Sequence, residues 1–155
     1  MADGPKELDP VERCKEIGRT CACYHLRRTA RAITRLYDDF LRPSGLRVTQ
    51  YSVLIVAKAR GPVALTKLAE MTTTERTTLT RNLTILEKKG FIRIEPGMDR
   101  RERQVSITEQ GQELLIKTMP LWEAAQAHIE KGLGEDRMAG LFKDLSEIIS
   151  LSRNT

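Results

Sequence analysis

The sequence contains little of what the common classes of enzyme need. It has only two histidines, His25 and His128, and no glycine-rich phosphate-binding motif. Nucleophilic catalysis usually pairs a Ser, Cys or Thr with a nearby base, and nucleotide chemistry usually needs a glycine-rich loop. We therefore expect a binding protein without a cofactor rather than an enzyme.

Long apolar runs are also missing. No stretch reaches the ~18 consecutive apolar residues of a membrane-spanning helix, and the chain does not open with a signal-peptide pattern. We therefore expect a cytoplasmic protein that does not bind membranes. Lysine and arginine number 26 against 21 aspartates and glutamates, which gives a net charge of +5 and a pI near 9.3. This modest excess favours a polyanionic partner without identifying it.

Cysteines are few, and all three lie near the N-terminus, at Cys14, Cys21 and Cys23. An odd number in a cytoplasmic chain argues against a disulfide framework. Cys21, Cys23 and His25 look like a metal cluster, but on a continuous helix Cys21 and His25 share a face that Cys23 does not. A zinc site would need an interrupted helix or ligands from a second subunit. We therefore expect no metal site.

The most informative segment runs from Thr72 to Gly90. Thr72 and Glu75 have the spacing of a capping box, and Gly90 stands where a helix-terminating glycine belongs. Between these ends, the helical period predicts a buried face made by Leu79, Leu83 and Leu86. The same period turns four polar residues outward together: Thr77, Arg81, Thr84 and Lys88.

This polar face suits the major groove of DNA. Arginine can bond the edges of guanine, and threonine can contact phosphates or the methyl group of thymine. Apart from the capping Glu75, no carboxylate occurs in the segment before Glu87. The predicted DNA-contacting residues of the helix are Thr74, Arg76, Thr77, Thr78, Thr80 and Arg81. The alternative is an ordinary solvated helix face.

The neighbouring segments favour DNA binding. A short helix over 65–69 precedes the segment with helix-turn-helix spacing. Two runs with alternating apolar residues, 91–95 and 104–107, predict antiparallel strands. The arginine-rich loop between them begins with a Pro-Gly turn and fits a minor groove or a phosphate backbone, the alternative being a solvated hairpin. The predicted contact residues of this wing are Asp99, Arg100, Arg101 and Arg103.

These motifs together resemble the MarR family of bacterial winged-helix transcription regulators. The matching segments are Leu65–Ala69, Leu79–Leu83, Leu86–Ile92, Asp99–Arg101 and Val105–Gly111, with Leu41–Leu46 and Thr49–Tyr51 upstream. The resemblance implies that Arg101 or Arg103 enters the minor groove and that Asp99 braces the wing through salt bridges. It also implies a small aromatic or anionic effector, for which His25, Arg28, Tyr51 and Trp122 are candidate lining residues.

Helices with apolar stripes are predicted at both ends of the chain. Apolar residues recur every three or four positions from Cys23 to Leu41, and a helix from Glu109 to about Lys131 is followed by a break at 132–134. The last helix carries an apolar stripe made by Met138, Leu141, Phe142, Leu145, Ile148 and Ile149. The economical partner for such stripes is a second copy, which would place two recognition helices on successive half-sites. The alternative is that these helices pack on their own subunit.

The sequence thus predicts a mainly α fold with a small β wing, in which a winged helix-turn-helix core is flanked by terminal dimerisation helices. We expect a flexible N-terminus over 1–10, an N-terminal dimerisation helix over 11–46, a DNA-binding domain over 47–108 and C-terminal dimerisation helices over 109–155. The predicted function is a repressor that binds a pseudo-palindromic operator in double-stranded DNA as a homodimer and is released by an effector.

The resemblance also implies an alternative mode of control. In an ungapped alignment backward from Thr49–Tyr51, Cys23 falls on the peroxidatic cysteine of the organic-hydroperoxide-sensing branch of the family, and Tyr37 on one of its tyrosines. Arg27 and Val48 occupy the positions of two further tyrosines. The alternative is therefore a thiol-based oxidant-sensing repressor, with Cys23 and Tyr37 as candidate sensor residues. Otherwise, Cys23 is a small apolar member of the helical stripe.

Overall fold

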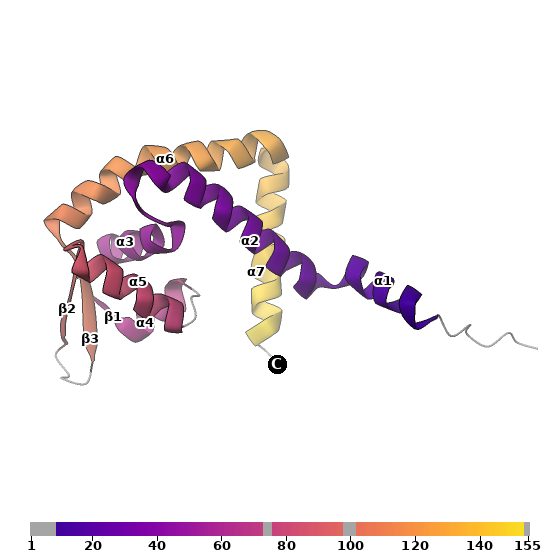
Figure 1. Cartoon of the computed structure of the whole chain (residues 1–155), viewed down its shortest axis with the longest axis horizontal. Coiled ribbons are helices and arrows are strands. Elements are labelled where there is room, and N and C mark those ends of the chain that lie inside the picture. The colour runs from indigo at the N-terminus through magenta and orange to yellow at the C-terminus, as the bar shows by residue number, and fades with distance from the viewer. Residues whose placement is uncertain (1–8, 73–75, 98–101, 154–155) are drawn as a thin grey trace, which may run out of the picture. The chain divides into compact units, whose positions relative to one another are not determined.

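The computed structural model describes residues 9–72, 76–97 and 102–153, and the chain forms two compact units, Met1–Leu36 and Tyr37–Thr155. Figure 1 labels the α-helices and the strands. In chain order the elements are α1 (Pro10–Thr20), α2 (Ala22–Leu41), the 3-10 helix η1 (Arg42–Ser44), α3 (Val48–Arg60), β1 (Val63–Ala64), α4 (Leu65–Thr72), α5 (Arg76–Lys88), β2 (Ile92–Pro96), β3 (Arg103–Ile107), α6 (Glu109–Leu133) and α7 (Glu135–Arg153). The prediction of a mainly helical fold with a small β wing is confirmed. Among the described helices, none combines the length and the apolar character that a membrane span requires.

The first unit contains α1 and most of α2, and the two helices are separated at Cys21. The backbone of Cys21 is extended, with φ −68° and ψ 107°, and its N–H donates to the carbonyl of Ile17 at the end of α1. Its Sγ accepts the N–H of Tyr24, and its carbonyl accepts the N–H of His25. Cys21 therefore caps the start of α2, and the assumption of a continuous helix through this residue is wrong. The segment predicted as one N-terminal helix over 11–46 contains α1, α2 and η1.

The second unit encloses the hydrophobic core. The buried residues come from the end of α2, from the loop before α3, from α3, α4 and α5, from the sheet and from α6. They are Leu41, Leu46, Tyr51, Val53, Leu54, Val63, Leu68, Leu79, Leu83, Leu86, Ile92, Val105 and Leu115. The predicted inner face of the recognition helix is confirmed, because Leu79, Leu83 and Leu86 are all almost completely buried.

A three-stranded antiparallel sheet has the order β1-β3-β2. Ile92 of β2 lies opposite Ile107 of β3, and Val63 of β1 lies opposite Val105. The two strands of the wing were predicted, whereas β1 was not, because it has only two residues and depends on its pairing with β3. The short β1 follows Gly61-Pro62 and leads directly into α4.

Two local motifs fix the ends of the recognition helix α5 and of α6. Gly90 has φ +75°, and its N–H donates to the carbonyl of Glu87, while the N–H of Phe91 donates to the carbonyl of Leu86. This pair of bonds is a Schellman motif, as expected for the glycine predicted to end the helix. Thr108 joins this helix end to the start of α6, because its hydroxyl donates to the Gly90 carbonyl at 2.6 Å and accepts the N–H of Gly111 at 3.0 Å.

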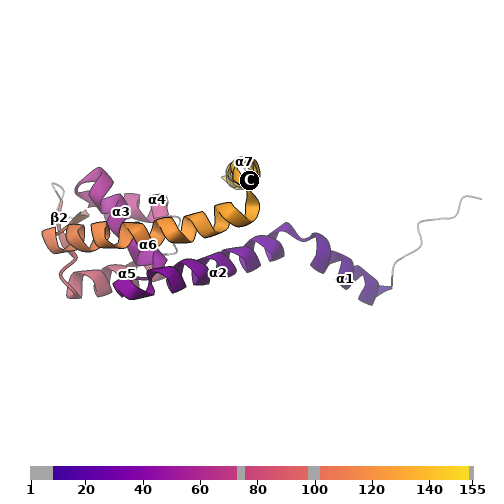
Figure 2. The ribbon, with the colours of Figure 1, turned by 90° about the horizontal axis from the view of Figure 1, so that it is seen from above.

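The last helix is separated from α6 at Gly134, which has φ +84°. After this residue α7 turns sharply away from α6, as both Figure 1 and Figure 2 show. Of the predicted apolar stripe, Met138 is buried and Leu145 half-buried, but the other members are exposed within the single chain: Leu141, Phe142, Ile148 and Ile149.

Candidate nucleic-acid interface

The outer face of α5 gathers the predicted contact residues on one exposed surface. The described members, all exposed, are Arg76, Thr77, Thr78, Thr80 and Arg81. Thr84 and Lys88 continue this face toward the end of the helix. Because the opposite face packs in the core, the leucines orient the polar side chains outward. Thr74 and the proposed cap Glu75 lie outside the described residues.

The threonine hydroxyls of this face are partly used within the helix. Oγ1 of Thr80 donates to the carbonyl of Arg76 at 2.8 Å, and Oγ1 of Thr84 donates to the carbonyl of Thr80 at 2.9 Å. A hydroxyl that donates inside the helix still offers its lone pairs and its methyl group to a partner. In this arrangement Thr80 and Thr84 are suited to contact a thymine methyl or to accept from a base amino group.

The described arginines of the interface, Arg76, Arg81 and Arg103, are available to bind an anion. The ion pairs among the described residues occupy other arginines, such as Arg42 with Asp39 and Arg47 with Asp38. Within the same part of the chain, Arg76, Arg81 and Arg103 are in none of these pairs. The cost of desolvating a guanidinium is reduced where a phosphate or the acceptor edge of guanine takes the place of its water.

The wing is the hairpin formed by β2 and β3. At its far end the N–H of Gly97 donates to the carbonyl of Glu102 at 2.8 Å, and exposed Arg103 begins β3. The hairpin joins the recognition helix through Gly90-Phe91 and joins α6 through Thr108, so that its base is held at both ends. The predicted wing residues Asp99, Arg100 and Arg101 lie outside the described residues.

Asn82 is a buried polar residue that the sequence reasoning missed. It lies on the inner face of α5 with only 7% of its surface exposed, and its Nδ2 has no hydrogen-bond partner in the described structure. The signal was available, because Asn82 follows Leu79 by three positions and precedes Leu86 by four, the spacing of one helix face. A buried donor without a partner costs about 1–3 kcal/mol.

The candidate sensor residues have different surroundings. Cys23 is exposed, and Cys14 and Cys21 are also free thiols. Tyr37 is half-buried, and its hydroxyl donates to Oε1 of Gln126 at 2.6 Å. Burial, and then the negative charge of Glu130, raise the pKa of Tyr37 above its ordinary value of 10.0. In the described part of the chain, no three His, Cys, Asp or Glu side chains are grouped to hold a metal ion.

The candidate effector residues are also distributed over both units. In the first unit, Nε2 of His25 lies 2.9 Å from the carbonyl oxygen of Arg19, while Arg28 is exposed. In the second unit, Tyr51 is only 3% exposed and belongs to the core, and Trp122 packs half-buried against the core. Burial, followed by the charge of Glu123, raises the pKa of Tyr51 above 10.0. Tyr51 is therefore a structural residue.

Comparison with known proteins identifies this architecture. The sequence model of the MarR family matches residues 46–102, which include the helix-turn-helix and most of the wing. The chain is similar to the M. tuberculosis transcriptional regulator MosR, with 33% identity, a TM-score of 0.80 and coverage of 89% of this chain and 99% of MosR. A structure of MosR in complex with DNA matches with 37% identity, a TM-score of 0.74 and coverage of 86% and 98%.

Two curated relatives are helix-turn-helix regulators. SarZ of Staphylococcus epidermidis is 33% identical over 93 residues, which cover 59% of this chain and 63% of SarZ. The uncharacterised regulator YwoH of Bacillus subtilis is 29% identical over 89 residues, which cover 57% of this chain and 65% of YwoH. The match therefore spans somewhat less than two thirds of each of these two relatives. The fold and the exposed helix face define a winged helix-turn-helix protein. The chain belongs to the MarR family.

Proposed function

We propose that the chain is a cytoplasmic DNA-binding repressor that occupies a pseudo-palindromic operator as a homodimer, without enzymatic activity. The observation that carries this proposal is the outer face of α5, where Arg76 and Arg81 are exposed beside threonines and outside any ion pair with a described residue. The wing adds Arg103 on the adjacent hairpin. The DNA complex of the similar regulator MosR supports the same use of this fold.

The exposed apolar residues of α7 support the dimer. Phe142 is 53% and Ile149 49% exposed in the single chain, and Leu141 and Ile148 are each 40% exposed. A contiguous apolar face of this kind usually marks an interaction surface. A second copy of the chain covers it economically, because a two-fold dimer presents two recognition helices spaced by ~10 base pairs, one turn of DNA.

Arg81→Ala is expected to weaken binding to the preferred sequence by about 10- to 100-fold, because a bidentate arginine contact to guanine contributes about 1–3 kcal/mol of discrimination. Binding to random-sequence DNA is expected to change much less. Mobility shifts on the DNA upstream of the protein's own gene and on a random duplex measure both effects.

Arg103→Ala is the matched wing variant in the same assay. It is expected to weaken binding to both duplexes evenly and to reduce the salt dependence by about two counterions, because each subunit of the dimer loses one phosphate contact. If both variants discriminated sequences as well as the unaltered protein, the assignment of the recognition helix would be wrong. We propose the same kind of DNA contact for Arg101 of the wing, with Asp99 bracing the wing through salt bridges.

We further propose that a small aromatic or anionic effector releases the repressor from DNA. Arg28 is the most suitable of the named candidates, because it is exposed and in no ion pair with a described residue. Repeating the mobility shift with a series of aromatic acids tests this mode of control. No loss of DNA binding across the series would argue against it.

The alternative is control by oxidation of Cys23. The observation that favours it is the exposure of Cys23, because a peroxide can reach an exposed thiol. In that reaction the thiolate attacks the terminal peroxide oxygen, the O–O bond breaks, the cysteine becomes a sulfenic acid and the peroxide is reduced to an alcohol.

Under this alternative, organic hydroperoxide at low molar ratio should release DNA, and Cys23→Ser should abolish the response. Cys14→Ser is the matched control and should respond like the unaltered protein, because Cys14 belongs to α1. DNA binding by the unaltered protein that persists after peroxide treatment would exclude oxidant control and leave the small effector.

A further inference from the structure

Helix α2 carries two chemically distinct faces. With ~100° of rotation per residue, Leu26, Ala30 and Ile33 fall on one side of the helix. Four arginines fall on the side roughly opposite: Arg27, Arg28, Arg31 and Arg35. We call these four residues the arginine row. Because the two faces point apart, covering the apolar stripe leaves the arginine row accessible.

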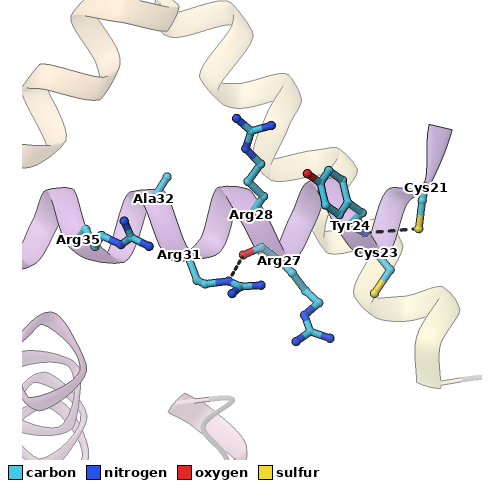
Figure 3. A pocket seen from close by; sticks show the side chains of 8 residues that line it. All are labelled: Cys21, Cys23, Tyr24, Arg27, Arg28, Arg31, Ala32 and Arg35. Atoms are coloured by element: carbon cyan, nitrogen blue, oxygen red, sulfur yellow. Dashed lines mark hydrogen bonds between the residues drawn. The ribbon is translucent and has the colours of Figure 1, made fainter. Parts of the chain in front are cut away.

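The arginine row surrounds an open hollow on the surface of the first unit. Its volume is about 680 Å³, and it is lined by Cys21, Cys23, Tyr24, Arg27, Arg28, Arg31, Ala32 and Arg35 (Figure 3). Nε of Arg31 donates to the carbonyl of Arg27 at 3.4 Å, and Tyr24 is 51% exposed. The lining thus offers guanidinium groups and a phenol hydroxyl, which are hydrogen-bond donors suited to an anion.

The charge of the row is uncompensated. No aspartate or glutamate occurs between Glu16 and Asp38, and the ion pairs of the described residues include none of the four arginines. Ordinary solvated faces mix charges of both signs. Like charges four residues apart, as in Arg27–Arg31 and Arg31–Arg35, destabilise a helix slightly, by a few tenths of a kcal/mol per pair. A bound polyanion would reverse this penalty.

We propose that the arginine row binds the phosphodiester backbone of duplex DNA, in addition to the contacts of the recognition helix and the wing. Arg27, Arg31 and Arg35 follow one another at a rise of ~6 Å, four residues of helix. Phosphates of one strand advance by ~3.4 Å per nucleotide along the duplex axis while they wind around it, so a row ~12 Å long can contact a few neighbouring phosphates. The contact carries no base information, because phosphates are the same at every sequence.

This inference rests on the proposed function, in that the chain must bind DNA. It adds a second, sequence-independent surface on a helix outside the winged core. In the proposed homodimer each subunit supplies one row, so the salt dependence of DNA binding should exceed what α5 and the wing provide. The spacing of the row favours an extended polyanion over a compact one, because the charges follow the helix axis rather than converge on one point.

The test compares the triple variant Arg27→Gln/Arg31→Gln/Arg35→Gln with two matched proteins. One carries Lys at the same three positions and keeps the charge. The other, Lys117→Gln/Arg137→Gln/Lys143→Gln, removes three exposed charges from α6 and α7. Binding to a random-sequence duplex several turns long is followed by fluorescence anisotropy over a series of salt concentrations. Circular dichroism and sedimentation velocity are recorded for each protein.

The glutamine triple is expected to bind at least about tenfold more weakly at low salt and to lower the slope of log K against log salt by about five, because the dimer loses six phosphate contacts at about 0.9 each. The lysine triple and the α6–α7 control should keep both values close to those of the unaltered protein. Equal slopes for the glutamine triple and the α6–α7 control would overturn the proposal. So would a change in sedimentation of the glutamine triple alone, because the row would then belong to a contact between copies.

The same assay separates this inference from the proposed function. Arg81→Ala tests the recognition helix through sequence preference, whereas the glutamine triple tests the row through the salt slope on random DNA. Suppose that the glutamine triple shows the expected reduction of the salt slope while Arg81→Ala keeps the sequence preference of the unaltered protein. This result would support the row and reject the assignment of the recognition helix. The reverse pair of results would reject the row alone.

Discussion

Gly111→Ala is expected to destabilise the winged core by about 3 kcal/mol, the upper range for overpacking in a rigid site. A Cβ at position 111 would lie 2.1 Å from the carbonyl oxygen of Phe91 and 2.9 Å from Cγ1 of Ile107. Backbone atoms cannot yield like a flexible side chain, so that α6 and the base of the wing must move apart. Denaturant unfolding measures the loss of stability.

The same substitution should also weaken DNA binding under conditions where the protein remains folded. The N–H of Gly111 donates to the hydroxyl of Thr108, and that hydroxyl donates to the Gly90 carbonyl at the end of the recognition helix. A shift of α6 at Gly111 should therefore also move the end of that helix. Gly132→Ala is the matched control, because a Cβ there meets no atom within 4 Å and alanine is the better helix former by up to about 1 kcal/mol. An equal stability for the two variants would contradict the close approach of α6 to Phe91.

Removal of α7 by ending the chain at Gly134 is expected to yield a monomer or an aggregate and to reduce operator affinity by about 100-fold or more, since two linked half-sites bind far more tightly than one. The reason is the exposed apolar face of α7, which has no cover within the single chain. Sedimentation velocity at micromolar concentration and the mobility shift measure the two effects.

A substitution separates assembly from folding. Leu141→Glu/Ile148→Glu places two carboxylates on the apolar face of α7 and should dissociate the dimer while the winged core stays folded. Lys143→Glu/Ser150→Glu adds the same carboxylates at exposed polar positions and should leave assembly intact. A full-length protein that sedimented as a monomer would remove the basis for the dimer.

Features governed by neighbouring residues could be predicted from the sequence. Gly90 and Gly134 end helices at positive φ, and the leucines of α5 face the core, because glycine conformation and helical period are local properties. β1 escaped prediction because its two residues become a strand only through pairing with Val105 and Gln104, far along the chain. The break at Cys21 escaped it because a thiol, instead of the usual hydroxyl or carboxylate, accepts the capping N–H.

The candidate interface was predictable to a similar extent. Outward orientation of Arg76 and Arg81 follows from the period of the leucines, and the structure places both on the exposed face. The choice between Arg101 and Arg103 as the minor-groove residue depends on the path of the wing loop, which no periodicity fixes. The burial of Asn82 was harder to predict, because its spacing from the leucines indicated the buried face of α5 while its polar side chain suggested the surface.

The order of the sheet leaves the wing with an open edge along β2. The hydrogen bonds Thr108 N–H to Phe91 O and Gly97 N–H to Glu102 O fix which residues of β2 pair with β3, so that the backbone groups of Ile92 and Ile94 point away from β3. An open edge can pair with the edge of another copy and start aggregation. Here the edge is short, it ends at Pro96, which has no N–H to donate, and it carries the charged side chains of Arg93 and Glu95. The wing can therefore project as a free hairpin while its own chemistry discourages strand-to-strand association.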